Sequence, residues 1–175
     1  MRAGVVVPSE TPVAVSDRLR ILAAALLFST GGAAIKACSL SALEVASLRS
    51  MFAAVTVLLI LPEARRGWTW RTWFVGASYA ATLVLYVLGN KLTTAANTIF
   101  LQSTAPIYIL LLSPLLLHER IRRSDLAFMA AIAGGMTLFF LGVQAPQITA
   151  PNPMLGNFLA ACAGVTWAIT ILGLR

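Results

Sequence analysis

The stretch LGNFLAACAGVTWAITILGL, residues 155–174, runs for twenty residues without a charge. A helix of that length spans about 30 Å, the thickness of the hydrocarbon layer of a membrane. Five further apolar stretches precede it, separated by short polar breaks, and 59% of the chain is hydrophobic. Because helices satisfy their own backbone hydrogen bonds in lipid, the sequence predicts an all-α membrane protein. We expect six transmembrane helices, at residues 19–37, 45–61, 70–88, 92–117, 126–143 and 155–174.

The cations outside these helices fall mostly in alternate breaks. Ten lie in the N-terminal segment, the second break, the fourth break and the final position: Arg2, Arg18, Arg20, Arg65, Arg66, Arg71, Arg120, Arg122, Arg123 and Arg175. Only Lys36 and Lys91 mark the first and third breaks. By the positive-inside rule, this bias predicts a multi-pass protein of the cell (inner) membrane with a cytoplasmic N-terminus.

The net charge of +7 raises the question of a nucleic-acid partner. A nucleic-acid surface needs one contiguous basic patch, whereas these cations lie at separate helix ends. We therefore expect the lipid bilayer as partner and no nucleic acid.

Polar residues inside the predicted helices form two stripes. In the third helix the stripe has the spacing of one helix face, with Tyr79, Thr82, Tyr86 and Asn90. In the fourth it comprises Thr94, Asn97, Thr104 and Tyr108, with Thr98 at its edge and Gln102 to one side. Both stripes on consecutive helices are expected to line one solute cavity. Hydrogen bonding between helices, worth about 0.6 kcal/mol each, is the competing interpretation, and it applies most to the threonines.

Three residues inside the apolar stretches have further consequences. Pro106 and Pro114 predict kinks in the fourth helix, because proline removes one backbone hydrogen bond. Arg49 lies in the second helix, about one turn from its external end. A cation at the bilayer centre costs about 2.5 to 3.5 kcal/mol, so Arg49 either bonds helix-end carbonyls or contacts an anionic solute.

Small residues recur at four-residue spacing, which predicts strips for close helix packing. The strips are Ala25, Ser29, Ala33 and Ala37; Ala46, Ser50 and Ala54; Ala127, Ala131 and Gly135; and Gly156, Ala160, Gly164 and Ala168.

The first and sixth helices align when Phe28 is laid over Trp167 and Lys36 over Arg175. Five helices per repeat is an odd number, so a second copy would enter the membrane in the opposite sense, as in the inverted repeats of many transporters.

Five segments, in their order and spacing, together resemble the EamA-domain family of the drug/metabolite transporter superfamily. They are LLFSTGGAAIK (26–36), SLRSMFAA (47–54), the run 93–119 with Pro106, Gly134 with Gly135, and GNFLAACAGVTWAITILGLR (156–175). The resemblance covers residues 19–175. It implies a protein of ten helices in two inverted five-helix repeats that moves small metabolites, amino-acid-like or drug-like solutes, often outward. It also implies that Thr166, Trp167 and Thr170 of the sixth helix contribute to the cavity.

Under this resemblance the chain is a first repeat plus the opening helix of a second, a fragment that needs the missing second repeat for activity. The expected divisions are a cytoplasmic tail at 1–18, the first repeat at 19–143, an external linker at 144–153 and a truncated second repeat at 154–175. We expect a transporter that works by alternating access. The resemblance implies export, and the residues themselves do not determine the direction.

Two other classes of membrane protein are alternatives to a transporter. An enzyme would need a catalytic cluster, and the sequence has no HExxH motif, no paired buried acids and no serine–histidine set. We therefore expect no catalytic residue, no metal and no cofactor. A non-transporting membrane scaffold or assembly subunit remains the alternative.

Overall fold

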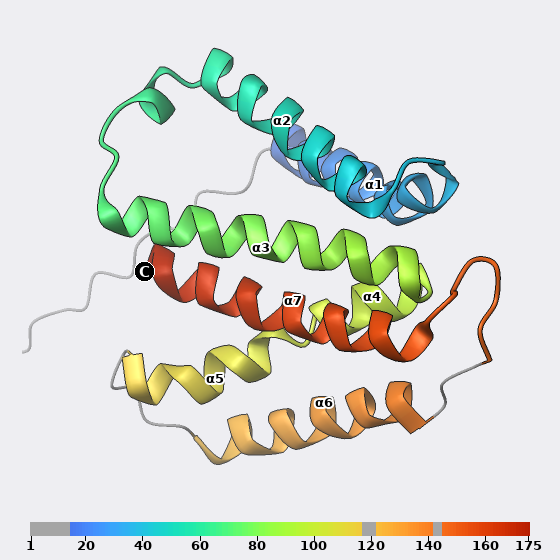
Figure 1. Cartoon of the computed structure of the whole chain (residues 1–175). Coiled ribbons are helices and arrows are strands. Elements are labelled where there is room, and N and C mark those ends of the chain that lie inside the picture. The colour runs from blue at the N-terminus through green and yellow to red at the C-terminus, as the bar shows by residue number, and fades with distance from the viewer. Residues whose placement is uncertain (1–14, 117–121, 142–144) are drawn as a thin grey trace, which may run out of the picture.

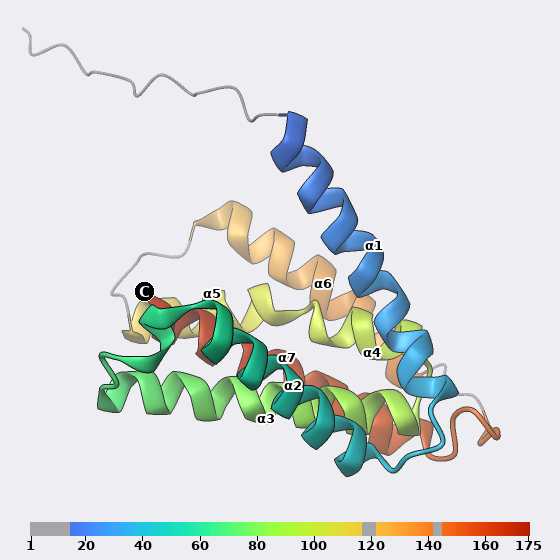
Figure 2. The same cartoon turned by 90° about the horizontal axis from the view of Figure 1, so that it is seen from above.

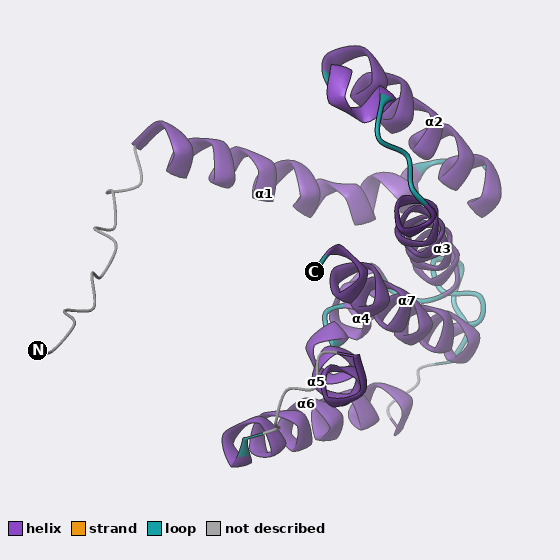
Figure 3. Ribbon diagram, turned by 90° about the vertical axis from the view of Figure 1, so that its left-hand side faces the viewer, coloured by secondary structure: helices purple, strands orange, loops and turns teal. Residues whose placement is uncertain are grey.

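The computed structural model describes residues 15–116, 122–141 and 145–175 (Figure 1). Its helices are α1 Val15–Ala37, α2 Ala42–Ile60, the short 3₁₀ helix η1 Pro62–Arg65, α3 Trp70–Leu92, α4 Ala95–Gln102, α5 Ala105–Leu116, α6 Arg123–Leu141 and α7 Pro153–Leu174. Helices α3 and α7 lie side by side and antiparallel at the centre (Figure 1). Helix α2 lies on one side of this pair, and α5 and α6 lie on the other (Figures 1 and 3). Helix α1 leans away from the bundle (Figures 2 and 3).

The all-α membrane class predicted from the sequence is confirmed. Among the described residues, five stretches are long and apolar enough to cross a membrane: Asp17–Ala37, Ala42–Ile60, Trp70–Leu92, Ala95–Pro114 and Pro153–Leu174. The apolar part of α6 is shorter, Ser124–Leu138. Most of the predicted N-terminal tail, residues 1–14, lies outside the described residues, as do residues 117–121 and 142–144 at the ends of two predicted helices.

Several helices begin earlier than hydropathy predicts, because polar residues cap them. Helix α2 begins at Ala42, not at residue 45: the Ser41 side chain accepts from the Glu44 amide at 3.3 Å, and the Glu44 carboxylate accepts from the Ser41 amide at 2.7 Å. Such a reciprocal pair satisfies two amides that the helix leaves free. Helix α7 likewise begins at Pro153, because Asn152 caps the amide of Leu155 at 3.2 Å.

The predicted fourth helix is two helices rather than one kinked helix. Helix α4 ends at Gln102 and α5 begins at Ala105, with Ser103 and Thr104 forming the turn between them. The cause is Pro106, whose ring clashes with a carbonyl four residues earlier and whose fixed φ suits a first helical turn. Pro114, by contrast, remains within α5.

Close approach of α3 and α7 depends on glycine. A Cβ added at Gly156 would lie 2.6 Å from the Thr93 amide nitrogen, and one at Gly89 would lie 3.1 Å from the Gly156 carbonyl oxygen. Ala160 and Ala168 are fully buried in the same strip of α7. The α7 strip is therefore a packing surface. Among the described residues, the strip of α1 is exposed along its length, at Ala25, Ser29, Ala33 and Ala37, so it is not buried against another helix there.

Hydrogen bonds from two lysines gather the first, third and fifth breaks at one end of the bundle. The Lys36 ammonium donates to the carbonyls of Thr93 and Thr149, and the Lys91 ammonium donates to the carbonyl of Cys38. At the opposite end of α3, the Arg71 guanidinium donates to the Gly173 carbonyl at 2.8 Å. The lysine-marked and arginine-marked breaks thus lie at opposite ends of the central helix pair.

Candidate solute cavity

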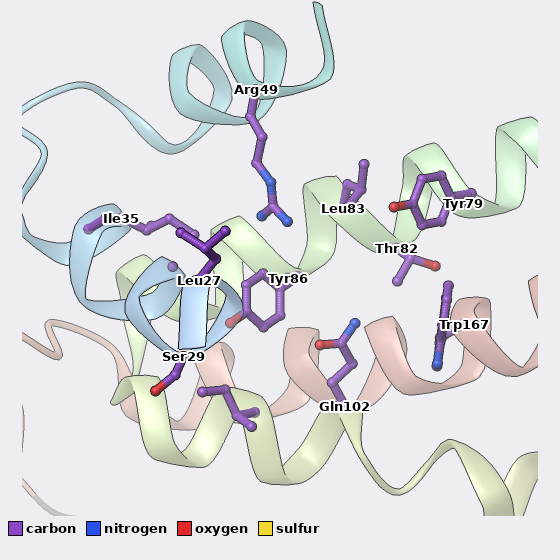
Figure 4. Close-up of a pocket in the computed structure, with 13 residues that line it drawn as sticks. Leu27, Ser29, Ile35, Arg49, Tyr79, Thr82, Leu83, Tyr86, Gln102 and Trp167 are labelled. Atoms are coloured by element: carbon purple, nitrogen blue, oxygen red, sulfur yellow. The ribbon is translucent and has the colours of Figure 1, made fainter. Parts of the chain in front are cut away.

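A cavity of about 750 Å³ lies between α1, α2, α3, α4 and α7 (Figure 4). Its volume is within the range of pockets that hold drug-sized molecules, about 300 to 1,000 Å³. Leucine, isoleucine and alanine side chains form much of the wall, and a small number of polar and aromatic side chains enter it. This pattern is typical of a binding site in which apolar walls exclude water and few polar groups orient a solute.

Four of the predicted site residues line this cavity: Tyr79, Thr82 and Tyr86 on α3, and Trp167 on α7. The tyrosines share one face of α3, as the sequence spacing predicts. The Tyr79 and Trp167 rings have centroids 5.9 Å apart and are tilted by 45°. Two helices that are distant in sequence therefore supply one aromatic wall.

The structure places the other four predicted site residues outside the cavity lining, in contacts between or within helices. The Asn97 amide donates to the Asn157 side-chain oxygen at 3.2 Å, and the Thr104 hydroxyl donates to the Leu101 carbonyl at 2.6 Å. The Tyr108 hydroxyl lies 3.9 Å from the Met136 sulfur. Thr166 accepts from the Thr82 hydroxyl at 2.8 Å. The predicted stripe on the fourth helix assumed a continuous helix, and the break at residues 103–104 separates its two halves.

Hydroxyl groups bind α7 to α3 along their contact. The Ser78 hydroxyl donates to the Thr166 carbonyl at 2.9 Å, and the Thr170 hydroxyl donates to the Ser78 hydroxyl at 3.1 Å. These bonds satisfy polar groups that lipid could not. Thr82 is only 1% exposed. It lies in the cavity wall, and its hydroxyl is used in the contact between α3 and α7.

Sequence reasoning missed Gln102 as a lining residue and left Arg49 undecided, yet both enter the cavity (Figure 4). The signal for Gln102 was its polarity within an apolar run. That the Gln102 side chain points into the cavity follows only from the position of α4, which ends at this residue. The α1 part of the wall, including Leu27, Ser29 and Ile35, carries no such signal, because its side chains are ordinary for a membrane helix.

No cluster of metal-binding side chains accompanies the cavity in the part of the chain that the structure describes. There, no group of three or more histidine, cysteine, aspartate or glutamate side chains could hold a metal ion. Membrane-length helices beside an apolar cavity, with one span broken into two helices, define a multi-pass helical membrane protein with a cavity between its helices.

The chain belongs to the EamA-like transporter family, which matches residues 19–141. The match spans α1 from Leu19 through α6 and so includes most of the cavity wall. The family assignment makes the chain a membrane protein of the drug/metabolite transporter type, in contact with the lipid bilayer. No curated protein and no solved structure matches the chain.

Proposed function

We propose that this chain forms the solute-binding half of a transporter that moves small metabolites, amino-acid-like or drug-like solutes, out of the cell by alternating access. The observation that carries the proposal is the 750 Å³ cavity, which lies beside the interruption between α4 and α5. In many transporters the solute site is formed by discontinuous helices, whose free backbone groups contact the substrate. The cavity and the interruption occur together here.

The orientation proposed is an N-terminus in the cytoplasm of the cell (inner) membrane. Its support is the ten-to-two bias of cations toward the arginine-marked breaks. In short loops, arginine and lysine accumulate on the cytoplasmic side. The lysine-marked end, where α1 meets α2 and α3 meets α4, then faces outward.

Helix α7 supports the proposal of a second repeat. It lies beyond the family match at residue 141 and aligns in sequence with α1. Its packing against α3 is close and polar, through Gly156 and Thr166. We therefore propose the divisions 1–18, 19–143, 144–153 and 154–175, with the rest of a second repeat completing the cavity wall.

Transport into everted membrane vesicles tests this function. Vesicles from cells that produce the chain together with the rest of a second repeat should accumulate tritiated aromatic amino acids or tritiated phenylacetate over time, because export from the cell is uptake into an everted vesicle. Vesicles from cells without the protein provide the baseline. Normal abundance of the protein with no accumulation of these solutes would favour the alternative, a non-transporting scaffold or assembly subunit.

A further inference from the structure

Arg49 brings a positive charge to one end of the cavity. It extends from α2 toward α3, and its guanidinium carbon lies 6.0 Å from the centroid of the Tyr86 ring (Figure 4). At that distance the quadrupole of the ring attracts the cation electrostatically. The contact orients the guanidinium, and within the described residues no hydrogen bond occupies its donors.

No carboxylate neutralises this charge within the described residues. The ion pair recorded there is between Arg20 and Asp17, at 3.4 Å on the surface of α1. The thirteen lining residues include no aspartate or glutamate. Arg49 also lies seven residues after the start of α2, about 10 Å along the helix. An arginine at such a depth has a cost that an anion would offset.

The other end of the cavity has a different chemistry. The Tyr79 and Trp167 rings form an aromatic wall, and the Gln102 amide lies between that wall and Tyr86 (Figure 4). Aromatic rings pack favourably against flat apolar groups, and an amide both donates and accepts hydrogen bonds. The cavity thus has a cationic end, an amide at its middle and an aromatic end.

We infer that the cavity selects small organic carboxylates with a flat, apolar body. The Arg49 guanidinium binds the carboxylate through charge-assisted hydrogen bonds, and Tyr79 and Trp167 pack against the body. This inference rests on the proposed function, because it names the solute class of the same site. An amine finds no acidic partner among the lining residues that the structure describes, so an organic cation of the same shape binds more weakly than the carboxylate.

Binding to the chain in nanodiscs of phosphatidylcholine tests the selectivity without transport. The probe is tritiated phenylacetate in a scintillation proximity assay, with competition by neutral phenylacetamide and cationic phenethylammonium. We expect phenylacetate to bind at least about tenfold more tightly than either competitor, a difference of one charge-assisted contact. Equal or tighter binding of phenethylammonium would overturn the inference, and this comparison needs no variant.

Variants then assign the selectivity to Arg49. Arg49→Gln should weaken phenylacetate binding by about tenfold or more and leave phenylacetamide binding within about threefold, whereas Arg49→Lys retains part of the preference. Arg66→Gln removes an exposed arginine outside the cavity and is the matched control. Monodisperse elution of each variant shows that it is folded. Unchanged phenylacetate binding in folded Arg49→Gln would contradict the assignment.

A lipid phosphate is the other possible source of an anion at Arg49. Nanodiscs of phosphatidylglycerol separate the two sources. Phenylacetate affinity that is the same in both lipids supports a soluble carboxylate, while loss of binding in phosphatidylglycerol shows that a headgroup occupies Arg49 and overturns the inference. Failure of the proposed function looks different: selective binding would persist in nanodiscs while everted vesicles show no flux.

Discussion

The hydroxyl of Thr82 on α3 donates a hydrogen bond of 2.8 Å to the hydroxyl of Thr166 on α7. The two residues are 84 positions apart, and the bond lies beside the cavity wall formed by Tyr79 and Trp167. One face of α3 therefore carries both the cavity and the attachment of α7. A substitution on this face affects solute binding, helix packing or both, according to the direction of its side chain.

Gly156→Ala should reduce the amount of folded protein in the membrane. The added Cβ would lie 2.6 Å from the Thr93 amide nitrogen and 2.8 Å from the Leu92 carbonyl carbon, and backbone atoms cannot move aside as a flexible side chain can. Overpacking of this kind typically costs about 1 to 3 kcal/mol. Thermal unfolding in detergent measures the loss. Gly76→Ala is the matched control, because nothing lies within 4 Å of its added Cβ. Equal stability of the two variants would contradict the close packing of α3 and α7.

Tyr86→Ala should reduce transport, whereas Asn97→Ala should reduce stability. Tyr86 lines the cavity, so its removal should reduce transport by about tenfold, a loss of roughly 1.4 kcal/mol of solute interaction, with abundance nearly unchanged. Asn97 bonds Asn157 and lies outside the lining, so its removal should lower thermal stability by about 0.6 kcal/mol and activity only in proportion to abundance. Transport per molecule distinguishes the two variants, measured in everted vesicles that contain quantified amounts of the chain together with the rest of a second repeat. A selective transport defect in Asn97→Ala would restore that residue to the binding site.

Orientation can be measured with single cysteines on a background lacking Cys38 and Cys162. Cysteines at Lys91 and Gln147 should react with an impermeant thiol reagent added outside intact cells, because they lie in or beside the third and fifth breaks. Cysteines at Gly67 and Arg122, in the second and fourth breaks, should react only after permeabilisation. The reverse labelling pattern would invert the proposed topology.

The isolated chain should not transport. Inverted-repeat transporters form their solute site between two oppositely oriented halves, and α7 is the one helix that we assign to the second. Two copies could replace the missing half only by inserting in opposite senses, which the cation bias opposes. Liposomes containing the chain should therefore show no flux of phenylacetate above empty liposomes, and co-production of the remaining second repeat should restore it. Robust flux from the chain alone would show that it is complete in function.

Local chemistry determined the parts of this protein that sequence predicts well. A membrane helix depends on the length of an apolar run and on the absence of charge, both of which can be counted at residues 155–174. Capping is also local: Ser41 and Glu44 are three residues apart, and their reciprocal bonds extend α2 to Ala42. Hydropathy alone predicts that α2 begins three residues too late, because it assigns both capping residues to the polar break before the helix.

The direction of each polar side chain was decided by the tertiary structure. Tyr86 and Asn97 are both polar groups in apolar helices, yet one lines the cavity and the other bonds to α7. Periodicity gives the face of a helix but not the neighbour that the face meets, since that depends on how the helix is rotated within the bundle. The turn at Ser103 and Thr104 also separates α4 from α5, and so Gln102 lies at the cavity while Thr104 and Tyr108 do not. Only packing of α7 against α3, through glycines that allow the two backbones to approach, brings Trp167 to Tyr79 and completes the aromatic wall.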